Sequence, residues 1–475
     1  MRTRQNKRIE QVAREQFGVA RLREGQRRVI ESVLAGHDTL AVMPSGSGKS
    51  LCYQVPAELL EGVTVVVSPL IALMRDQCEK LEQSGIEGVA EVNSSLPAQE
   101  EQAALEDIAE ARKDIIFCTP ERLATPGFIE LLRQRHIALL VVDEAHCISK
   151  WGHDFRPAYL EIGAALQALG RPPVLALTAT ATDEVVDDIA RQLGTLAINI
   201  INTGVYRPNL HYRVRQVTNH EDRQALLLRL VQESGGAGIV YAATVKMVET
   251  LYAQLAQAGQ SVARYHGKMR APERHESQRQ FMEGERRVMV ATNAFGMGID
   301  KADVRFVLHL QVPANLEAYY QESGRAGRDG RAAECTLLYF DEDKRVQQFF
   351  LTRRYRRDDP ERAAQQERDR AALEQMVGYA QSGYCRWQLL LDYFGDRPPG
   401  FTRCGQCDNC LLPPLERARI DDAELVLPSI DEGRAAGVGS MARLDVGRLL
   451  LVAGERIAIA FPESGSMAFM AEFVE

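Results

Sequence analysis

The sequence predicts an α/β protein made of two parallel-sheet domains of similar size, followed by a helical metal-binding subdomain and a small C-terminal β-barrel. The first observation is a series of short, unbroken apolar runs rich in Val, Ile and Leu, separated by helical stretches. Such runs are typical of strands buried on both faces of a parallel sheet. The second is that the series breaks near 203–215 and then starts again. The third is a group of four cysteines between 385 and 410, after the second series has ended.

The composition is that of an ordinary globular protein. The chain has 475 residues, of which 45% are hydrophobic and 26% charged, enough for two or three domains. No stretch reaches the roughly 18–20 uncharged apolar residues of a membrane span. The first residues, Met1 to Arg8, are not followed by the apolar segment of a secretory signal. We therefore expect a cytoplasmic protein that does not bind membranes.

The net charge of −8 would by itself argue against a nucleic-acid partner. However, residues 411–475 contain 6 Arg and 11 Asp or Glu, a net of −5. The other 410 residues are close to neutral, so they can still form a local basic groove.

The expected elements follow this pattern. Residues 1–34 are expected to be helical. The first set of expected strands is 39–43, 63–67, 114–117, 138–142, 174–177 and 197–201. The second set is 238–241, 262–265, 287–290, 304–308 and 335–339.

Residues 345–395 are expected to form Arg-rich helices. The run Arg353 to Arg357 lies beside three acidic residues, which favours a solvated helix face with local ion pairs over a DNA contact. Residues 396–435 contain Pro, Gly and acidic clusters. The predicted divisions are 1–203, 204–343, 344–412, a linker at 413–435 and a terminal unit at 436–475.

The terminal unit, 436–475, is expected to be a small barrel of the SH3 or Tudor type. A strand-like run covers 446–452, and Ile457, Ile459 and Phe461 alternate with alanines as in a half-buried strand. Its acidic balance favours docking to a protein partner over direct DNA binding, and a passive terminal cap is the alternative.

A glycine-rich loop follows the first expected strand and precedes a helix. It runs Met43-Pro-Ser-Gly-Ser-Gly-Lys-Ser50, with Met43 where the phosphate-loop pattern normally has its first Gly. Backbone N–H groups of such a loop cradle phosphates. Lys49 would reach the terminal phosphates, and Ser50 would hold Mg²⁺. The predicted nucleotide-binding residues of the loop are Ser45, Gly46, Ser47, Gly48, Lys49 and Ser50.

An acidic pair closes another expected strand, at Val141-Val-Asp-Glu-Ala-His146. Asp143 would hold Mg²⁺, and Glu144 would polarise the attacking water. The alternative is an ordinary acidic pair at a strand end. The phosphate loop earlier in the chain favours the ATP-site interpretation.

The four clustered cysteines have the spacing of a metal centre. Cys404, Cys407 and Cys410 form two successive Cys-x-x-Cys steps, and Cys385 lies 19 positions upstream of Cys404. This matches a four-thiolate Zn²⁺ site, with an iron–sulfur cluster as a weaker alternative. Cys385 is expected on a helix and the other three in a turn. The remaining five cysteines are scattered in apolar contexts, as in a reduced cytosolic protein.

The order of these motifs resembles that of the superfamily-two helicases. Further strings narrow the resemblance to the RecQ family of DNA helicases: Ser68-Pro-Leu-Ile-Ala-Leu-Met-Arg-Asp-Gln77, Asp143-Glu-Ala-His-Cys-Ile-Ser-Lys-Trp-Gly-His-Asp-Phe-Arg-Pro157 and Asn293-Ala-Phe-Gly-Met-Gly-Ile-Asp-Lys301. The resemblance covers about residues 10–412. It implies that the two domains are RecA-like and use ATP with Mg²⁺, and that the cysteines bind Zn²⁺.

The resemblance also implies site residues. Arg23 and Gln26 would recognise adenine, although Val19 stands where the family often has an aromatic residue. Gln321, Arg325 and Arg328 would close over the γ-phosphate, with Arg328 as the arginine finger. The other implied members of the ATP site are His146, Gly298 and Asp300.

The segment from Ser149 to Pro157 resembles the family's aromatic-rich loop. Trp151 and Phe155 offer faces on which unpaired bases can stack. His153 and Arg156 would link DNA contact to the ATP site beside Glu144.

The resemblance therefore implies an ATP-dependent DNA helicase or translocase, moving 3′ to 5′ on single-stranded or partially duplex DNA in repair or recombination, and associated with the nucleoid. Family members usually continue with a winged helix, whose pattern is not seen after residue 412. An RNA helicase, or an ATP-gated DNA-binding or annealing factor, are the alternatives.

Overall fold

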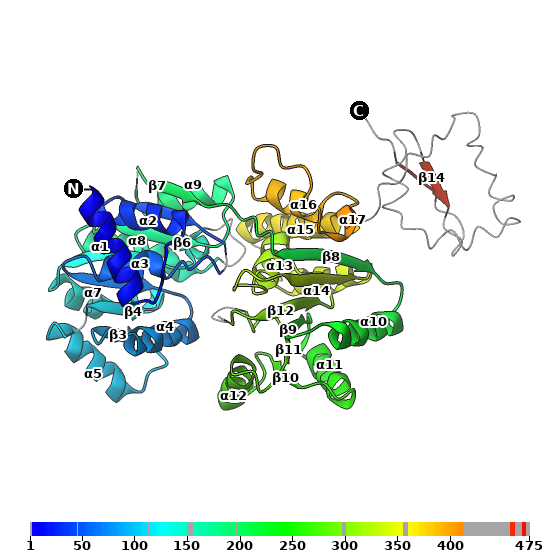
Figure 1. The fold of residues 1–475 in the computed structure, drawn as a ribbon, viewed down its shortest axis with the longest axis horizontal. Coiled ribbons are helices and arrows are strands. Elements are labelled where there is room, and N and C mark those ends of the chain that lie inside the picture. Colours follow the sequence, from blue (N-terminus) through cyan, green and yellow to red (C-terminus); the bar gives the residue numbers. More distant parts are fainter. Residues whose placement is uncertain are drawn as a thin grey trace, which may run out of the picture.

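The computed structural model describes residues 2–411, apart from 45, 113, 150–154, 196, 297–300 and 355–359, together with two strands at 457–460 and 468–471. Figure 1 shows two α/β domains side by side, with a helical subdomain beside the second. Within these described ranges every helix falls short of the length and apolarity that a bilayer crossing requires.

The first domain is built on a seven-stranded sheet in the order β3-β4-β2-β5-β6-β1-β7, in which every strand pair is parallel. In β2, Val63, Val65 and Val67 belong to one hydrophobic cluster, whereas Val66 belongs to another. Alternate side chains thus enter cores on opposite faces, which is why the strand needs an unbroken apolar sequence.

The strands of this sheet are β1 (Thr39–Val42), β2 (Val63–Val67), β3 (Val89–Val92), β4 (Ile115–Cys118), β5 (Ile137–Val142), β6 (Val174–Thr178) and β7 (Asn199–Asn202). The helices are α1 (Arg2–Glu15), α2 (Glu24–Leu34), α3 (Leu51–Ala57), α4 (Ile71–Gln83), α5 (Ala98–Ala109), α6 (Pro120–Leu123), α7 (Pro126–Arg133), α8 (Ile162–Ala168) and α9 (Asp183–Gln192), with short 3₁₀ turns η1 (Ala145–Ile148) and η2 (Pro157–Glu161).

The second domain has a six-stranded parallel sheet in the order β10-β11-β9-β12-β13-β8. Its strands are β8 (Leu210–Gln216), β9 (Ala237–Tyr241), β10 (Val262–Tyr265), β11 (Val288–Ala291), β12 (Val304–His309) and β13 (Ala333–Tyr339). Its helices are α10 (His220–Glu233), α11 (Val245–Gln257), α12 (Ala271–Met282) and α13 (Leu316–Ser323). Residues 203–209 connect the two sheets, and we call them the linking segment.

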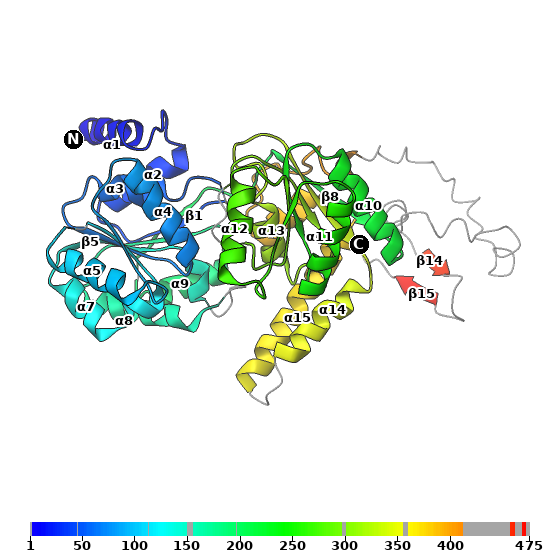
Figure 2. The ribbon, with the colours of Figure 1, turned by 90° about the horizontal axis from the view of Figure 1, so that it is seen from below.

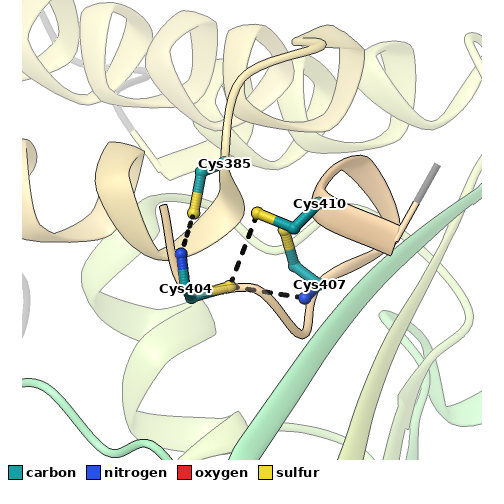
Figure 3. A group of neighbouring side chains, drawn as sticks. All are labelled: Cys385, Cys404, Cys407 and Cys410. Atoms are coloured by element: carbon teal, nitrogen blue, oxygen red, sulfur yellow. Dashed lines mark hydrogen bonds between the residues drawn. The ribbon is translucent and has the colours of Figure 1, made fainter. Parts of the chain in front are cut away.

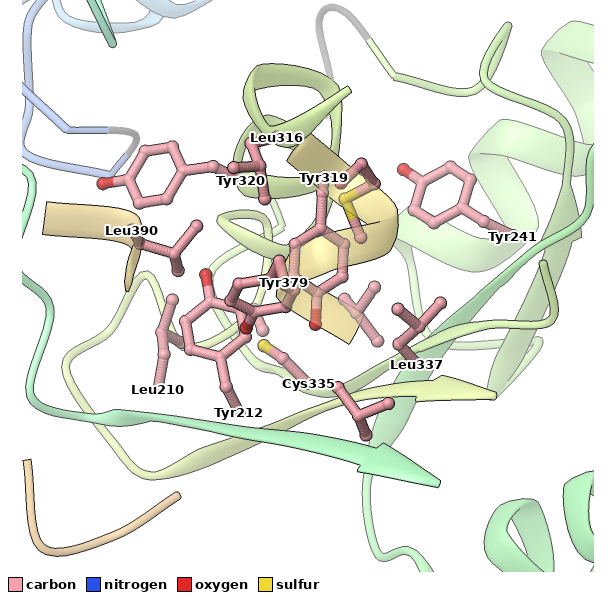
Figure 4. Close-up of a cluster of buried hydrophobic side chains, with 14 of the residues drawn as sticks. Leu210, Tyr212, Tyr241, Leu316, Tyr319, Tyr320, Cys335, Leu337, Tyr379 and Leu390 are labelled. Atoms are coloured by element: carbon pink, nitrogen blue, oxygen red, sulfur yellow. The ribbon is translucent and has the colours of Figure 1, made fainter. Parts of the chain in front are cut away.

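The helical subdomain contains α14 (Asp343–Arg354), α15 (Pro360–Gln381), α16 (Arg386–Tyr393) and α17 (Asp408–Leu411). In Figure 2, α14 and α15 extend away from the second domain as a pair of neighbouring helices. Among the described residues, the buried apolar side chains of the subdomain belong to the same cluster as those of the second sheet. Figure 4 shows Tyr379 and Leu390 among Leu210, Tyr212 and Tyr319 of the second domain.

The parallel-sheet prediction is confirmed, but two strands were not expected. In β3, the half-buried Glu91 interrupts the apolar run. In β8, buried and partly exposed residues alternate, because the strand lies at the sheet edge and so lacks the unbroken apolar signature. The expected domain boundary near 203–215 therefore overlaps a strand of the second sheet.

The C-terminal strands β14 (Ile457–Ala460) and β15 (Ala468–Ala471) pair antiparallel, with Ile457 opposite Ala471. This pairing agrees with the strand expected around Ile457 and Ile459. The strand expected at 446–452 lies outside the described residues, and so does the linker at 413–435. The barrel stays a prediction.

Candidate ATP site, aromatic-rich loop and zinc centre

The glycine-rich loop lies between β1 and α3, as the sequence predicts. Gly46 and Gly48 adopt left-handed backbone angles, with φ of +77° and +78°, which glycine tolerates without strain. Ser47 is buried, and its hydroxyl has no hydrogen-bond partner among the described residues. An orphaned hydroxyl beside Lys49 fits a loop that receives phosphate oxygens. Ser45 lies outside the described residues.

Arg23 and Gln26, at the start of α2, both contact this loop through their side chains. The side-chain amide of Gln26 donates to the carbonyls of Ser47 and Gly48, at 2.9 and 3.1 Å, and accepts the Arg23 backbone N–H at 2.9 Å. Arg23 Nη1 donates to the Gly46 carbonyl at 3.1 Å. The two residues therefore tie α2 to the phosphate loop, and their contact with adenine stays a prediction.

Asp143 and Glu144 follow β5. Burial, reinforced by the neighbouring Glu144 carboxylate and opposed by Lys49, raises the pKa of Asp143 to about 7. A carboxylate that is costly to ionise is stabilised by a nearby cation, so the position fits a divalent metal ion. Glu144 has a φ of +48°, a left-handed conformation that is strained for a residue with a Cβ.

A chain of polar contacts connects Glu144 to the end of β6. His146 Nδ1 lies 3.4 Å from Glu144 Oε2 and 3.1 Å from the hydroxyl of Thr178. That hydroxyl donates to the carbonyl of Thr180 at 2.8 Å. The structure thus joins His146 to Thr178 at the end of β6 and, through Thr178, to Thr180.

Two residues that sequence reasoning missed also support this region. The hydroxyl of buried Tyr159 donates to the Asp143 carbonyl at 3.0 Å. Asp188 on α9 accepts a 2.8 Å hydrogen bond from the hydroxyl of Ser149. Neither belongs to a recognisable motif, because the contacts arise from the packing of elements that are separate in sequence.

Three residues predicted to close over the phosphate come from α13 and the loop that follows it. Arg328 lies against the phosphate loop, since a Cβ added at Gly46 would be 2.8 Å from Arg328 Cγ and 3.1 Å from its Cβ. Arg325 is only 7% exposed, and one of its terminal nitrogens would lie 3.1 Å from a Cβ at Gly296. Gln321 is half-buried in α13. Gly298 and Asp300 lie outside the described residues.

The aromatic-rich loop is described only at its two ends. Trp151 and His153 lie outside the described residues, whereas Phe155 is half-buried. The Arg156 backbone N–H donates to the Cys147 carbonyl at 3.0 Å, and its Nη1 donates to the Pro69 carbonyl at 3.1 Å. With the Ser149–Asp188 bond, these contacts fix both ends of the loop, which begins a few residues after Glu144.

The four predicted zinc ligands come together. Figure 3 shows Cys385, Cys404, Cys407 and Cys410 converging, and their four sulfurs lie within 4.8 Å of one another. The Cys404 and Cys410 sulfurs are 3.8 Å apart, which matches the roughly 3.8 Å sulfur separation of a tetrahedral site with Zn–S bonds of about 2.3 Å. A cluster of several irons and sulfides would hold the thiolates further apart, so a single Zn²⁺ fits better.

Two details of this centre differ from expectation. Cys385 is the residue that precedes α16 rather than a helical residue, and Cys410 lies within the short α17. Backbone N–H groups point at the sulfurs, such as that of Cys404 at 3.2 Å from Cys385 Sγ. These donors favour the thiolate form that a metal requires.

An ion pair and a tryptophan connect β8 to the helical subdomain, which we call the zinc subdomain from here on. The Arg386 guanidinium donates to both Asp408 oxygens at 3.0 Å, and the second of these oxygens also accepts the Val214 N–H at 2.9 Å. Trp387 Nε1 donates to the Leu210 carbonyl at 3.0 Å. Because these partners belong to the second domain, the metal centre is part of that domain's packing.

Comparison with known families agrees with this architecture. Residues 23–189 match the DEAD/DEAH box helicase family, residues 222–330 the helicase conserved C-terminal domain, and residues 341–411 the RecQ zinc-binding family.

Curated proteins include similar relatives. The chain is 43% identical to the ATP-dependent DNA helicase RecQ of Bacillus subtilis over 417 residues, covering 87% of this chain and 68% of that protein. It is 38% identical to the protein of the same name from Haemophilus influenzae, covering 87% of this chain and 65% of that one. The chain thus spans about two thirds of the length of these bacterial relatives.

Among solved structures, the Mycobacterium smegmatis helicase Lhr bound to single-stranded DNA and AMP-PNP superimposes with a TM-score of 0.58 at 20% identity. The match covers 79% of this chain and 58% of that one, and at this identity it shows the shared fold of two RecA-like domains. The paired sheets, the four converging cysteines and the close bacterial relatives agree: the chain belongs to the RecQ family of ATP-dependent DNA helicases.

Proposed function

We propose that this chain hydrolyses ATP in the cleft between its two sheets and uses the cycle to move on single-stranded DNA and unwind duplexes. The observation that carries the proposal is the contact of Arg328 with Gly46, which brings a cation of the second domain to the phosphate loop of the first. A cation supplied across a closing cleft stabilises the charge that develops during phosphoryl transfer.

Each catalytic residue receives a role consistent with its position. Lys49 neutralises charge on the terminal phosphates, and Glu144 orients the attacking water. Ser50 and Asp143 would hold Mg²⁺, which supplies further charge neutralisation when it is bound. Arg328 acts as the arginine finger, with Arg325 beside it, while Gln321 contributes from α13. The strained backbone of Glu144 is consistent with a side chain that must point into the cleft.

DNA contact is proposed to reach this site through the aromatic-rich loop. Trp151 and Phe155 would stack on unpaired bases, and the loop ends are held by the hydrogen bonds of Ser149 to Asp188 and of Arg156 to the Pro69 carbonyl. Stacking of a base on this loop would thus move a segment that begins only a short distance along the chain from the Glu144 carboxylate.

By family resemblance we propose 3′ to 5′ movement in DNA repair or recombination.

We also propose that 436–475 forms a small barrel that docks a protein partner, and the antiparallel pairing of β14 with β15 supports a β-structure there. Deleting 436–475 should leave DNA-stimulated hydrolysis largely intact. Loss of hydrolysis in a deletion variant that still folds would assign the segment to the motor instead.

The central experiment measures ATP hydrolysis with single-stranded DNA, single-stranded RNA or duplex as activator, and unwinding of 3′-tailed and 5′-tailed duplexes. Glu144→Gln should still bind ATP but lose turnover. We expect stimulation by single-stranded DNA and unwinding of the 3′-tailed substrate. Stimulation by RNA alone would favour an RNA helicase, and stimulation without unwinding would favour an annealing factor.

A further inference from the structure

Arg207 contacts the loop that carries both cleft arginines. It lies in the linking segment between β7 and β8 and is 8% exposed. Its Nη1 donates to the Gly324 carbonyl at 2.6 Å, and its Nη2 donates to the carbonyls of Ala326 and Gly327, both at 2.7 Å. These carbonyls flank Arg325 and directly precede Arg328. We call residues 324–331 the arginine loop.

Asn209, two residues further along, holds the same loop. Its Nδ2 donates to the carbonyls of Gly327 and Arg331 at 2.8 and 2.9 Å. Gly327 has a φ of +56°, and a Cβ there would lie 2.5 Å from Asn209 Nδ2. The loop is therefore tightly folded against the linking segment, without space for a side chain at Gly327.

The chemistry of Arg207 suits this contact. Its planar guanidinium has five donors in a fixed fork and can bind several carbonyls at once, whereas a lysine ammonium is a compact point charge. No carboxylate among the described residues forms an ion pair with Arg207, so its hydrogen bonds go to the backbone of the arginine loop. A buried cation used in this way orders the loop.

The linking segment is itself held in place from the zinc subdomain. The Val205 N–H donates to Asp396 Oδ2 at 2.5 Å, and the Tyr320 hydroxyl donates to the Val205 carbonyl at 2.6 Å. The Tyr206 ring packs edge-on against Trp387, with ring centroids 4.9 Å apart. The residues just before Arg207 are thus held in position by contacts with the zinc subdomain and with α13.

We propose that Arg207 is a positioning residue for ATP hydrolysis, which orders the arginine loop so that Arg328 meets the phosphate when the cleft closes. The inference rests on the proposed function of Arg328. It predicts that Arg207 acts on turnover rather than on ATP binding, because the arginine loop is needed only in the closed, reacting state.

The test compares Arg207→Lys with Arg287→Lys. Arg287 is a matched control in the same domain, because its guanidinium donates to the carbonyls of Val231, Ser234 and Gly236, which lie outside the arginine loop. With saturating single-stranded DNA, Arg207→Lys should lower kcat by about tenfold or more, since a misplacement of about 1 Å can cost 10²-fold in rate. The KM for ATP should change by less than about twofold, and Arg287→Lys should keep the parent kcat to within a similar factor.

A double-variant cycle then identifies the route of the effect. If Arg207 acts through Arg328, adding Arg207→Lys to Arg328→Ala should lower kcat no further. Asn209→Ala is a milder second variant, expected to give a smaller loss of kcat with KM unchanged. Melting temperatures should fall equally in Arg207→Lys and Arg287→Lys.

The outcomes separate the two proposals. Parent-like hydrolysis in Arg328→Ala would overturn the proposed function. An inactive Arg328→Ala together with a parent-like Arg207→Lys would overturn only the inference. Equal losses of kcat in Arg207→Lys and Arg287→Lys, or fully additive losses in the double variant, would likewise reduce Arg207 to a structural residue.

Discussion

Arg328 and Gly46 meet across the two domains, so closely that a Cβ on the glycine would lie 2.8 Å from Arg328 Cγ. Gly46 is therefore restricted twice: by its left-handed φ of +77°, and by the arginine stem that occupies the space where a side chain would project. This contact shows where a cation of the second domain approaches the phosphate loop.

Gly46→Ala should abolish most ATP turnover, because the added methyl group displaces Arg328. Gly36→Ala is the matched control, since Gly36 has the same φ of +77° with no atom within 4 Å of an added Cβ. The control should lose about 1 kcal/mol of stability and keep its hydrolysis rate. Steady-state kinetics and thermal melting of both variants test this, and equal turnover in the two would show that hydrolysis does not depend on the contact of Gly46 with Arg328.

Trp151→Ala should weaken DNA stimulation more than basal hydrolysis. Stacking of a base on an aromatic side chain contributes about 1–3 kcal/mol, and losing it should raise the DNA concentration needed for half-maximal stimulation. Hydrolysis rates measured across a titration of single-stranded DNA provide the test. Equal loss of basal and stimulated rates would instead indicate a folding role for Trp151.

Zinc should be structural, because four thiolates leave no open coordination position. Elemental analysis should find one Zn²⁺ per chain, and Cys407→Ser should lower the melting temperature and solubility. Cys335→Ser is a suitable control, since Cys335 is buried in β13 and is not one of the four converging cysteines. Iron and labile sulfide in the purified protein would show that the metal assignment is wrong.

The buried pair of Arg223 and Asp343 should make stability depend on pH. Their side chains are 2.7 Å apart, and burial, only partly offset by Arg223, raises the pKa of Asp343 from 3.8 to about 6. A carboxyl with a raised folded-state pKa binds its proton more tightly when folded. Its contribution to the free energy of unfolding therefore decreases as the pH rises from about 4 to 6, and is then constant.

Asp343→Asn removes that titration. The free energy of unfolding of the parent, relative to that of the variant, should thus be about 1–3 kcal/mol larger near pH 4 than near pH 7, since each pKa unit corresponds to about 1.4 kcal/mol. Denaturant unfolding of both proteins at several pH values gives this difference. A difference that rises with pH would contradict the assigned direction.

The sequence by itself determined the order of the elements and the type of each chemical group. Unbroken apolar runs such as Val63–Val67 predicted buried parallel strands, because only a strand covered on both faces needs them. The sequence also predicted the phosphate loop, the acidic pair at Asp143 and the cysteine cluster, because the chemistry of each depends on residues that are close along the chain.

Tertiary structure alone decided the contacts between distant segments. The edge strand β8 escaped prediction because it alternates, and it is held by its pairing with β13 and by hydrogen bonds with Trp387 and Asp408 from the zinc subdomain. Nothing near Arg207 in sequence indicates that it binds the arginine loop more than a hundred residues away. Such contacts depend on how two sheets and their linking segment fold together, and local sequence patterns carry no information on that arrangement.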